Sequence, residues 1–198
     1  MESMIDVLLN AVKEGDIKKV KLILASGADV NEKNKHGETA IDFAAFYGHI
    51  DICKLLIEKG ADVNAITNYG ISPLVSATIE DNKEICKLLV ESGADVNLRC
   101  EYERVALMYA AEHGNKSICK MLIENGADVN AIDKHGWPVI AWAASTHKNE
   151  ICKMLIKNGA NVNIKQIENI GRKDMVKTIT EVENSCKKLP ADEETIDC

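Results

Sequence analysis

Apolar residues along this chain recur three and four positions apart in short segments, which glycine and polar residues separate. Ile41, Ala44 and Ala45 lie in one such segment, and Ile52 and Leu55 lie in the next. This spacing places the apolar side chains of each segment on one face of a helix. The pattern therefore predicts two short amphipathic helices in succession.

The pair of segments repeats at a fixed interval. The phrase Gly-Ala-Asp/Asn-Val-Asn closes each copy, and its last residue recurs every 33 positions, at Asn31, Asn64, Asn97, Asn130 and Asn163. The glycine of the phrase stands where a helix would end with a residue in left-handed conformation. A two-helix unit cannot bury its apolar face alone, so a fixed period of this length predicts a stack of units with one continuous core.

Several features of the unit together resemble the ankyrin repeat family. They are the period, the two helices, the Gly-Ala-Asp-Val-Asn ending and the paired alanines at 44–45, 110–111 and 143–144. The resemblance implies an all-α fold, an ankyrin-type α-solenoid of stacked helix-turn-helix repeats with β-turn hairpin fingers. It covers residues 1–184 as a single domain. The implied units are a cap at 1–31, full repeats at 32–64, 65–97, 98–130 and 131–163, and a second cap at 164–184.

The two ends depart from the repeated pattern. Residues 1–31 keep both helical segments, at 5–12 and 17–24, but lack a hairpin. Lys177 follows Lys153 by 24 residues rather than 33, so we expect a truncated capping repeat that keeps most of its second helix. Residues 185–198 are predicted to form an acidic, flexible tail.

The copy at 98–130 departs from the others where its first helix begins. The family favours Thr-Pro-Leu-His there, which Ser72-Pro73-Leu74 approximates, and no copy has the histidine. Val105 cannot accept a hydrogen bond from a free helix amide, and the loss of such a cap costs about 1 kcal/mol. Glu103 takes the place that glycine has in the other hairpins. Because a positive φ would strain this residue, we expect the hairpin at 100–104 to be reshaped.

Charge and composition narrow the class of partner. The net charge of −7 at pH 7 argues against nucleic acid, because phosphate binding needs a basic surface. No apolar run approaches the roughly 20 residues that span a bilayer, and no leader opens the chain. Seven cysteines without a secretion signal favour a reducing, cytoplasmic location. Short chains with this resemblance also occur as effectors exported into host cells, but no signal in the sequence supports that role.

Four cysteines recur at the repeat interval: Cys53, Cys86, Cys119 and Cys152. Equivalent positions on neighbouring helices lie about 8–10 Å apart. A disulfide needs Cα atoms within about 7 Å, and a zinc site needs thiolates that converge on one ion. The position carries Val20 in the first copy and Val176 in the last. We therefore predict buried apolar cysteines, no metal site and no cofactor.

Two other residue types recur in register, and each has a functional and a structural interpretation. A ladder of lysines follows the cysteine position, at Lys21, Lys54, Lys87, Lys120, Lys153 and Lys177. It is either a basic stripe or a solvated face, and we favour the solvated face because Glu58, Glu91 and Glu124 follow at helical spacing. For the recurrent asparagine, the resemblance implies a site that asparaginyl hydroxylases modify. We favour a structural role, in which these side chains tie the hairpin turn.

The sequence shows no constellation of catalytic residues. The five histidines share no ligand spacing, at His36, His49, His113, His135 and His147. A glycine-rich phosphate loop, a Gly-x-Ser-x-Gly elbow and a His-Glu-x-x-His motif are all absent from the sequence. We therefore predict no catalytic residue and no enzyme activity.

The resemblance implies that a partner protein binds the hairpin tips and the inner face of the first helices. These are also the positions at which the copies differ most. The predicted tip residues are Lys35, His36, Glu38, Asn68, Tyr69, Ile71, Glu101, Tyr102, Arg104, Lys134, His135 and Trp137. The predicted residues at the helix ends are Phe46, Tyr47, Ile79, Glu80, Glu112, His113, Ser145 and Thr146. Aromatic side chains are enriched among binding hot spots, and this set is rich in them.

The aromatic residues leave alternatives open. Tyr69 and Tyr102 either face a partner or pack across to the next hairpin, and Trp137 is expected to be the more exposed. Another first-helix position belongs either to the groove or to the core, and it carries Phe43, Tyr109 and Trp142.

The sequence thus predicts a non-catalytic protein–protein interaction module, an adaptor, scaffold or inhibitor that acts as a monomer. A self-associating structural repeat protein is the alternative, and its mass in solution would depend on concentration. An enzyme, or the regulatory module of one, is the weakest alternative, because it would need a pocket with convergent polar groups.

Overall fold

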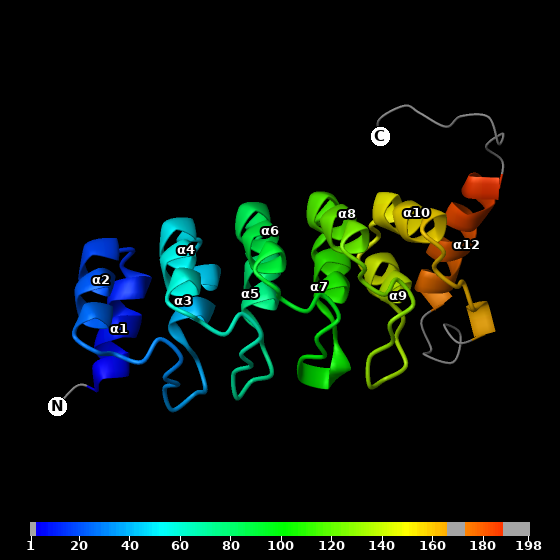
Figure 1. Ribbon diagram of the computed structural model, residues 1–198. Helices are drawn as coiled ribbons and strands as arrows, with labels where there is room; N and C mark the ends of the chain where they lie inside the picture. Colours follow the sequence, from blue (N-terminus) through cyan, green and yellow to red (C-terminus); the bar gives the residue numbers. More distant parts are fainter. Residues whose placement is uncertain (1–2, 166–172, 188–198) are drawn as a thin grey trace.

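The computed structural model describes residues 3–165 and 173–187, in which helices stack in antiparallel pairs (Figure 1). The pairs are α1 (Met4–Lys13) with α2 (Ile17–Ala25), α3 (Ala40–Phe46) with α4 (Ile50–Glu58), α5 (Pro73–Ile79) with α6 (Lys83–Glu91), α7 (Ala106–His113) with α8 (Lys116–Glu124), and α9 (Val139–Ser145) with α10 (Asn149–Lys157). Helix α12 (Lys173–Lys187) follows the last pair. No strand forms within the described ranges, so the predicted all-α solenoid is confirmed.

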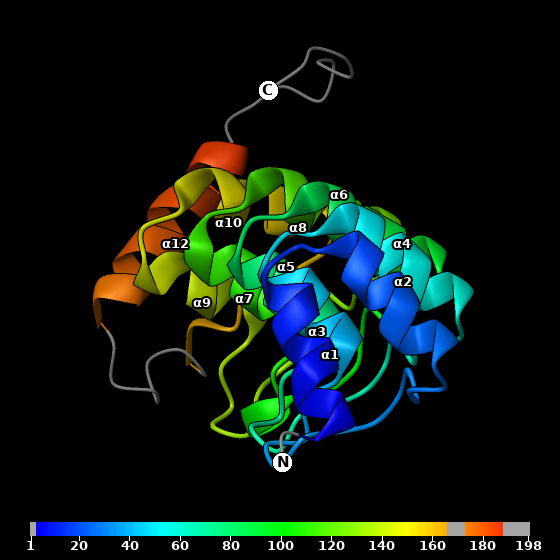
Figure 2. The ribbon, with the colours of Figure 1, turned by 90° about the vertical axis from the view of Figure 1, so that its left-hand side faces the viewer.

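The helices form two layers, and the hairpins project from one of them. The first helices of successive pairs pack on one another, and so do the second helices, with the more extensive contacts in the first layer. Figure 2, a view turned by 90° from that of Figure 1, shows the second helices along the outside and the hairpin loops below the first helices. The hairpins and the exposed side of the first helices together form one surface, which we call the inner surface.

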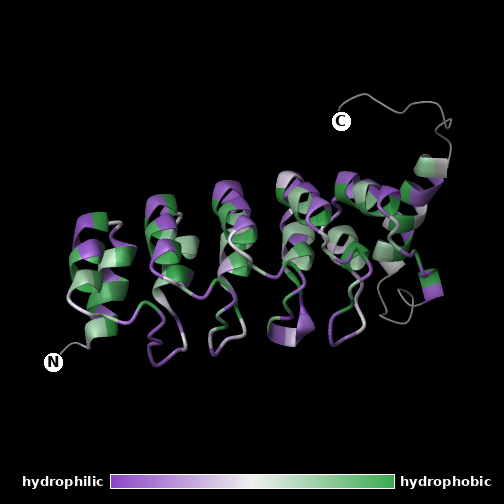
Figure 3. Ribbon diagram, viewed as in Figure 1, coloured by the Kyte–Doolittle hydropathy of each residue, from purple (hydrophilic) through white to green (hydrophobic). Residues whose placement is uncertain are grey.

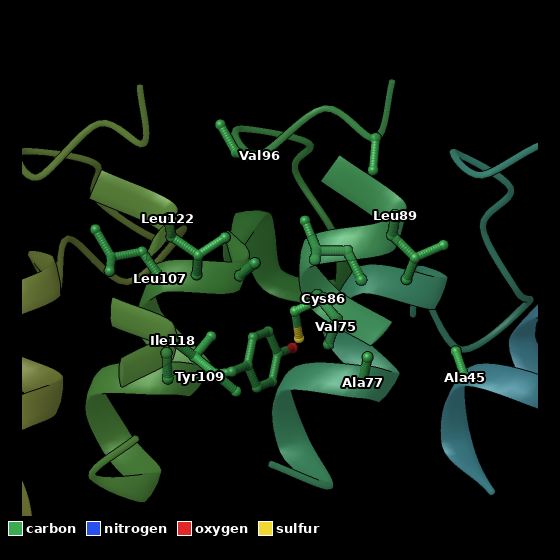
Figure 4. Close-up of a cluster of buried hydrophobic side chains, with 14 of the residues drawn as sticks. Ala45, Val75, Ala77, Cys86, Leu89, Val96, Leu107, Tyr109, Ile118 and Leu122 are labelled. Atoms are coloured by element: carbon green, nitrogen blue, oxygen red, sulfur yellow. The ribbon is translucent and has the colours of Figure 1, made fainter. Parts of the chain in front are cut away.

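The core is continuous through the stack because each helix buries its apolar face against the neighbouring pair. Figure 3 shows apolar residues on the faces that the helices turn to one another, and polar residues on the hairpins. Figure 4 shows Val75 and Leu89 of one pair and Leu107 and Ile118 of the next among the buried apolar side chains of this core. The paired alanines predicted to allow close packing are fully buried in α3, α7 and α9.

The four recurrent cysteines are small buried residues of this core, as predicted. Cys53, Cys86, Cys119 and Cys152 are all 0% exposed and free. Burial disfavours the thiolate, so the pKa of Cys86 is raised to about 11 and the pKa values of the other three are raised to about 12. Val20 takes the same buried place in α2, but Val176 is only partly buried.

Helix α12 explains this difference, because it does not occupy the place of a second helix alone. It contacts both α9 and α10, and it buries Met175, Ile179 and Val182 against them. Figure 1 shows it crossing the level of both layers at the end of the stack. The helix runs to Lys187, and so includes the first residues of the range predicted as a tail. The rest of that tail, 188–198, and much of the predicted cap, 166–172, lie outside the described residues.

The starts of the first helices follow the sequence-based expectations. The Thr39 backbone N–H and hydroxyl both donate to Asp42 Oδ2, at 2.8 Å and 2.7 Å. Ser72 Oγ accepts from the backbone N–H of Val75 at 3.3 Å. Val105 provides no side-chain cap to α7. The backbone N–H of Met108 donates to the Val105 carbonyl instead, at 2.9 Å.

The hairpin before α7 is reshaped, as predicted. Its tip is a 3₁₀ turn (η1, Glu101–Glu103), in which Tyr102 and Glu103 both have a φ of 58°. Glu103 corresponds to Gly37, Gly70 and Gly136 in the other hairpins, which take a positive φ without a Cβ. Main-chain bonds still join this hairpin to its neighbours, from Glu101 N to the Gly70 carbonyl at 2.7 Å and from Lys134 N to the Tyr102 carbonyl at 2.9 Å.

The recurrent asparagine joins each copy to the next. The Asn64 side-chain amide donates to the Gly93 carbonyl at 3.1 Å, and Asn64 Oδ1 accepts from Asp95 N at 2.8 Å. The same pair of bonds to the following copy is made by Asn31, Asn97 and Asn130. The predicted side-chain hydrogen bonds are present, and they join the following copy rather than the asparagine's own turn. That turn is held by the preceding aspartate, since Asp62 Oδ1 accepts from Asn64 N at 2.9 Å.

Candidate functional site

Exposed aromatic rings gather on the inner surface. Phe46 and Tyr47 at the end of α3 are 47% and 39% exposed, and Tyr69 and Tyr102 at the hairpin tips are 55% and 45% exposed. The short helices end, and the hairpins turn, where these side chains stand, so no neighbouring helix covers them. Large apolar rings that remain in water are candidates for contact with another molecule.

The predicted site residues differ in their exposure. The exposed ones are Lys35, Phe46, Tyr47, Asn68, Tyr69, Glu80, Glu101, Tyr102, His113, Lys134, His135 and Thr146. The half-buried ones are His36, Glu38, Ile71, Ile79, Arg104, Glu112, Trp137 and Ser145. The half-buried set shows where the inner surface is held together, and the exposed set shows which side chains face water.

The tip tyrosines both contact the neighbouring hairpin and remain about half exposed. Tyr69 Oη lies 2.8 Å from His36 Nδ1, and the two rings stack with centroids 5.7 Å apart. The Tyr102 ring lies 5.9 Å from that of His135, and Lys134 Nζ stands 3.7 Å from its centroid. The two alternatives for these residues are therefore compatible. Contact across hairpins fixes each ring and leaves one side of it in water.

Arg104 is engaged within the protein rather than free for a partner. Its guanidinium lies 3.9 Å from the centroid of the Tyr109 ring and 3.8 Å from that of Trp142. It also forms an ion pair with Glu112, and its side chain is only 13% exposed. Trp137 is half-buried because its ring packs at 4.9 Å against Trp142. The expectation that Trp137 is the more exposed aromatic is wrong.

The first-helix position that carries three aromatic residues is divided between core and groove. Tyr109 is 7% exposed and belongs to the core, where burial raises the pKa of its hydroxyl. Phe43 and Trp142 are half-buried at the inner surface. The guanidinium of Arg104 lies over the rings of both Tyr109 and Trp142, and Phe43 lies beside Tyr47, with ring centroids 5.8 Å apart.

A pocket of about 280 Å³ opens on the inner surface between α3 and α5. It brings together six of the predicted residues: Glu38, Phe46, Tyr47, Tyr69, Ile71 and Ile79. The other lining residues are Asp42, Phe43, Thr67 and Ser76. Hairpin and helix residues thus converge at this point, which is therefore our candidate site.

Asp42 is a lining residue that sequence reasoning missed. It is 4% exposed, and its Oδ2 accepts both bonds from Thr39 while its Oδ1 has no hydrogen-bond partner. Burial raises the pKa of this carboxyl to about 6, against the hydrogen bonds from Thr39 and the charge of Lys33, which lower it. One signal was available: Asp42 stands where the family motif has its histidine.

The outer face carries the lysine ladder as a solvated surface. Lys87 pairs with Glu91 at 3.7 Å and Lys120 with Glu124 at 4.0 Å, both at the predicted spacing. Lys54 instead pairs with Asp51, at 3.7 Å. These side chains are more than half exposed, and ion pairs of this kind contribute little to stability.

The described residues hold no other obvious chemistry. No three or more histidine, cysteine, aspartate or glutamate side chains within 3–165 and 173–187 are grouped so that they could hold a metal ion. In the same ranges, none of the helices combines the length and the apolar character that a membrane crossing requires.

The fold and the site define a helical repeat protein with hairpin fingers and an aromatic inner surface. The family model "Ankyrin repeats (3 copies)" matches residues 8–100 and again 98–166. The chain belongs to the ankyrin repeat family, whose members are generally protein–protein interaction modules and typically non-catalytic. No curated protein matches this chain.

Proposed function

We propose that this chain is a non-catalytic adaptor, scaffold or inhibitor that binds a partner protein through its inner surface. The observation that carries the proposal is the row of exposed aromatic rings on that surface, from Phe46 and Tyr47 to Tyr69 and Tyr102. These rings are fixed by contacts to neighbouring side chains, so little conformational entropy is lost when a partner covers them. A rigid surface with half-exposed aromatic rings suits protein recognition.

The inner surface favours this role over the outer face. On the outer face, glutamate and aspartate neutralise the lysines within one helical turn, and no row of aromatic rings is found among its described residues. The proposed partner is a protein rather than nucleic acid, since the net charge of −7 opposes phosphate binding. Seven cysteines favour action in a reducing compartment such as the cytoplasm.

The test is affinity capture from a lysate of the cells that make the protein. The wild-type bait is compared with a Phe46→Ala/Tyr69→Ala/Tyr102→Ala variant, whose positions are exposed and whose fold is checked by circular dichroism. A matched control changes three exposed outer residues instead, as Leu22→Ala/Lys87→Ala/Lys120→Ala. A protein retained by wild type and control but lost by the inner-surface variant supports the proposal. Equal capture by all three baits would move the site away from this surface.

A second candidate function is self-association through the same rings, as in a structural repeat protein. It is favoured only by the exposed apolar area, which a second copy of the chain could cover as well as a different protein. Sedimentation at several protein concentrations separates the two. A monomer mass at all concentrations supports binding of another protein, and a mass that rises with concentration and falls in the inner-surface variant supports self-association.

A further inference from the structure

The pocket between α3 and α5 combines aromatic walls with two acidic side chains. Phe43, Phe46, Tyr47 and Tyr69 supply rings, and Glu38 and Asp42 supply carboxylates. None of the ten residues that line it in the described part of the chain is basic. Aromatic faces carry negative charge density, so rings and carboxylates attract the same kind of ligand.

The Asp42 carboxylate is incompletely satisfied. Both of its described hydrogen bonds, from the backbone and the hydroxyl of Thr39, go to Oδ2. Its Oδ1 has no hydrogen-bond partner although the residue is 96% buried, and such a group costs free energy unless it is paired. The other copies have Val75, Met108 and Ala141 at this position, so the acidic floor is peculiar to this pocket.

The positive charges near the pocket leave it unneutralised. Lys33 acts on Asp42 through space, but its ammonium donates to the Ile66 carbonyl at 3.1 Å. Lys13 stands 5.8 Å from the Tyr47 centroid, and it does not line the pocket. Glu38 is bonded through Oε2 to the Asn34 side chain at 2.7 Å, and it still contributes its charge to the wall.

Resting on the proposed protein-binding function, we propose that this pocket receives a lysine or arginine side chain of the partner protein. The aliphatic stem lies along Phe43, Phe46 and Ile79, and the cationic head meets the ring faces and the charge of Asp42 and Glu38. A volume of about 280 Å³ holds one such side chain. The pocket is open to the inner surface, so an extended segment can insert its side chain without a change of the backbone.

The test uses two short peptides, acetyl-Gly-Gly-Lys-Gly-Gly-amide and the same peptide with arginine, followed by NMR. The control peptide carries norleucine, which has the stem without the charge. We expect the ring signals of Phe43, Phe46 and Tyr69 to shift and saturate with the lysine or the arginine peptide, and not with norleucine. No shift with either cationic peptide, or equal shifts with norleucine, would overturn the proposal.

Variants of the two acidic residues test whether their charges bind the cation. Asp42→Asn is expected to weaken the binding about tenfold, because the negative charge at the floor of the pocket is lost, while Oδ1 of the new amide can still accept from the Thr39 backbone. Glu38→Gln keeps the bond from Asn34 and is expected to weaken binding severalfold, and it serves if Asp42→Asn does not fold. Glu91→Gln on the outer face is the matched control and leaves the affinity unchanged. Unchanged affinity in both pocket variants would show that the carboxylates do not bind the cation.

The two proposals can fail separately. If the peptides do not bind but the capture finds a partner that the inner-surface variant loses, the cation site is overturned and the protein-binding role is left intact. If the wild type and the inner-surface variant capture the same proteins, the proposed role of this surface in protein binding is overturned, even if the peptides bind.

Discussion

The guanidinium of Arg104 lies over the ring of Trp142, 3.8 Å from its centroid, and so joins a hairpin to the first helix of the next pair. The same guanidinium covers Tyr109 from its own pair and forms an ion pair with Glu112. A planar cation can stack on two rings and bond at its edge at the same time. This arrangement adds side-chain contacts to the main-chain bonds that join the reshaped hairpin to its neighbours.

Replacement of Arg104 is therefore expected to destabilise the protein. Arg104→Ala removes both ring contacts and leaves Glu112 without its partner, at a cost of about 2 kcal/mol or more. Arg104→Lys retains the charge but not the planar stack, so we expect an intermediate loss. Urea unfolding followed by circular dichroism measures both. Midpoints equal to that of the wild type would show that the cluster adds nothing to stability.

Repetition made most of the fold predictable, because each residue of the pattern was seen several times in register. The buried cysteines, the paired alanines and the uncapped start at Val105 all follow from local rules applied to one repeat. The partners of the asparagine bonds were not predictable, because Asn64 reaches a residue in the next copy and one repeat alone carries no information on that contact. The place of α12 depends on packing against two helices at once, which a shortened pattern does not reveal.

The candidate site was predictable only in part. The resemblance indicates which positions face inward, and six of them line the pocket. The burial of Trp137 and Arg104 results from long-range contacts with Trp142, so their types and spacing did not show it. Asp42 was overlooked because it was judged as a departure from a motif, and not as an ionisable group placed in an apolar helix face.

A substitution at the strained tip of the hairpin before α7 is expected to stabilise the protein. Glu103 has a φ of 58°, and its ion pair with Arg99, at 3.7 Å, is exposed and weak. Glu103→Gly is expected to raise the free energy of unfolding by about 0.5–1 kcal/mol, because glycine adopts this conformation without strain. Glu101→Gly is the matched control, since its φ is not positive, and we expect it to lower stability. The midpoints of urea unfolding test both variants. A lower midpoint for Glu103→Gly than for the wild type would show that the backbone of Glu103 is not strained.

The cysteine ladder predicts a sharp difference in thiol reactivity. The thiols of Cys53, Cys119 and Cys152 are fully buried with pKa values raised to about 12, whereas Cys186 is partly exposed. The thiolate is the reactive form of cysteine. At pH 8 the three buried thiols should therefore react with iodoacetamide only when the protein unfolds locally. Peptide mass mapping after brief labelling is expected to find Cys186 modified and the three buried residues unmodified. Labelling of all four at similar rates would show an open core, and labelling in urea provides the positive control.

The raised pKa of Asp42 predicts how the stability of the protein depends on pH. Its carboxyl pKa is raised from 3.8 to about 6 on folding, so the folded protein binds more protons than the unfolded chain between these values. The contribution of Asp42 to stability is therefore fully present below about pH 4 and is lost as the pH rises through 6. The loss is on the order of 2–3 kcal/mol, from 1.36 kcal/mol for each unit of pKa.

The measurement is the difference in unfolding free energy between wild type and Asp42→Asn at intervals from pH 4 to pH 7. Other titrating groups, including Glu38 beside the carboxyl, are common to both proteins and cancel to first order. We expect the wild type to lose stability relative to the variant as the pH rises, most steeply near pH 6. A difference that stays constant would show that folding does not shift the pKa of Asp42, and one that grows in favour of the wild type would show that a group within the protein stabilises the anion. Such a result would also remove the unsatisfied carboxylate on which the cation pocket depends.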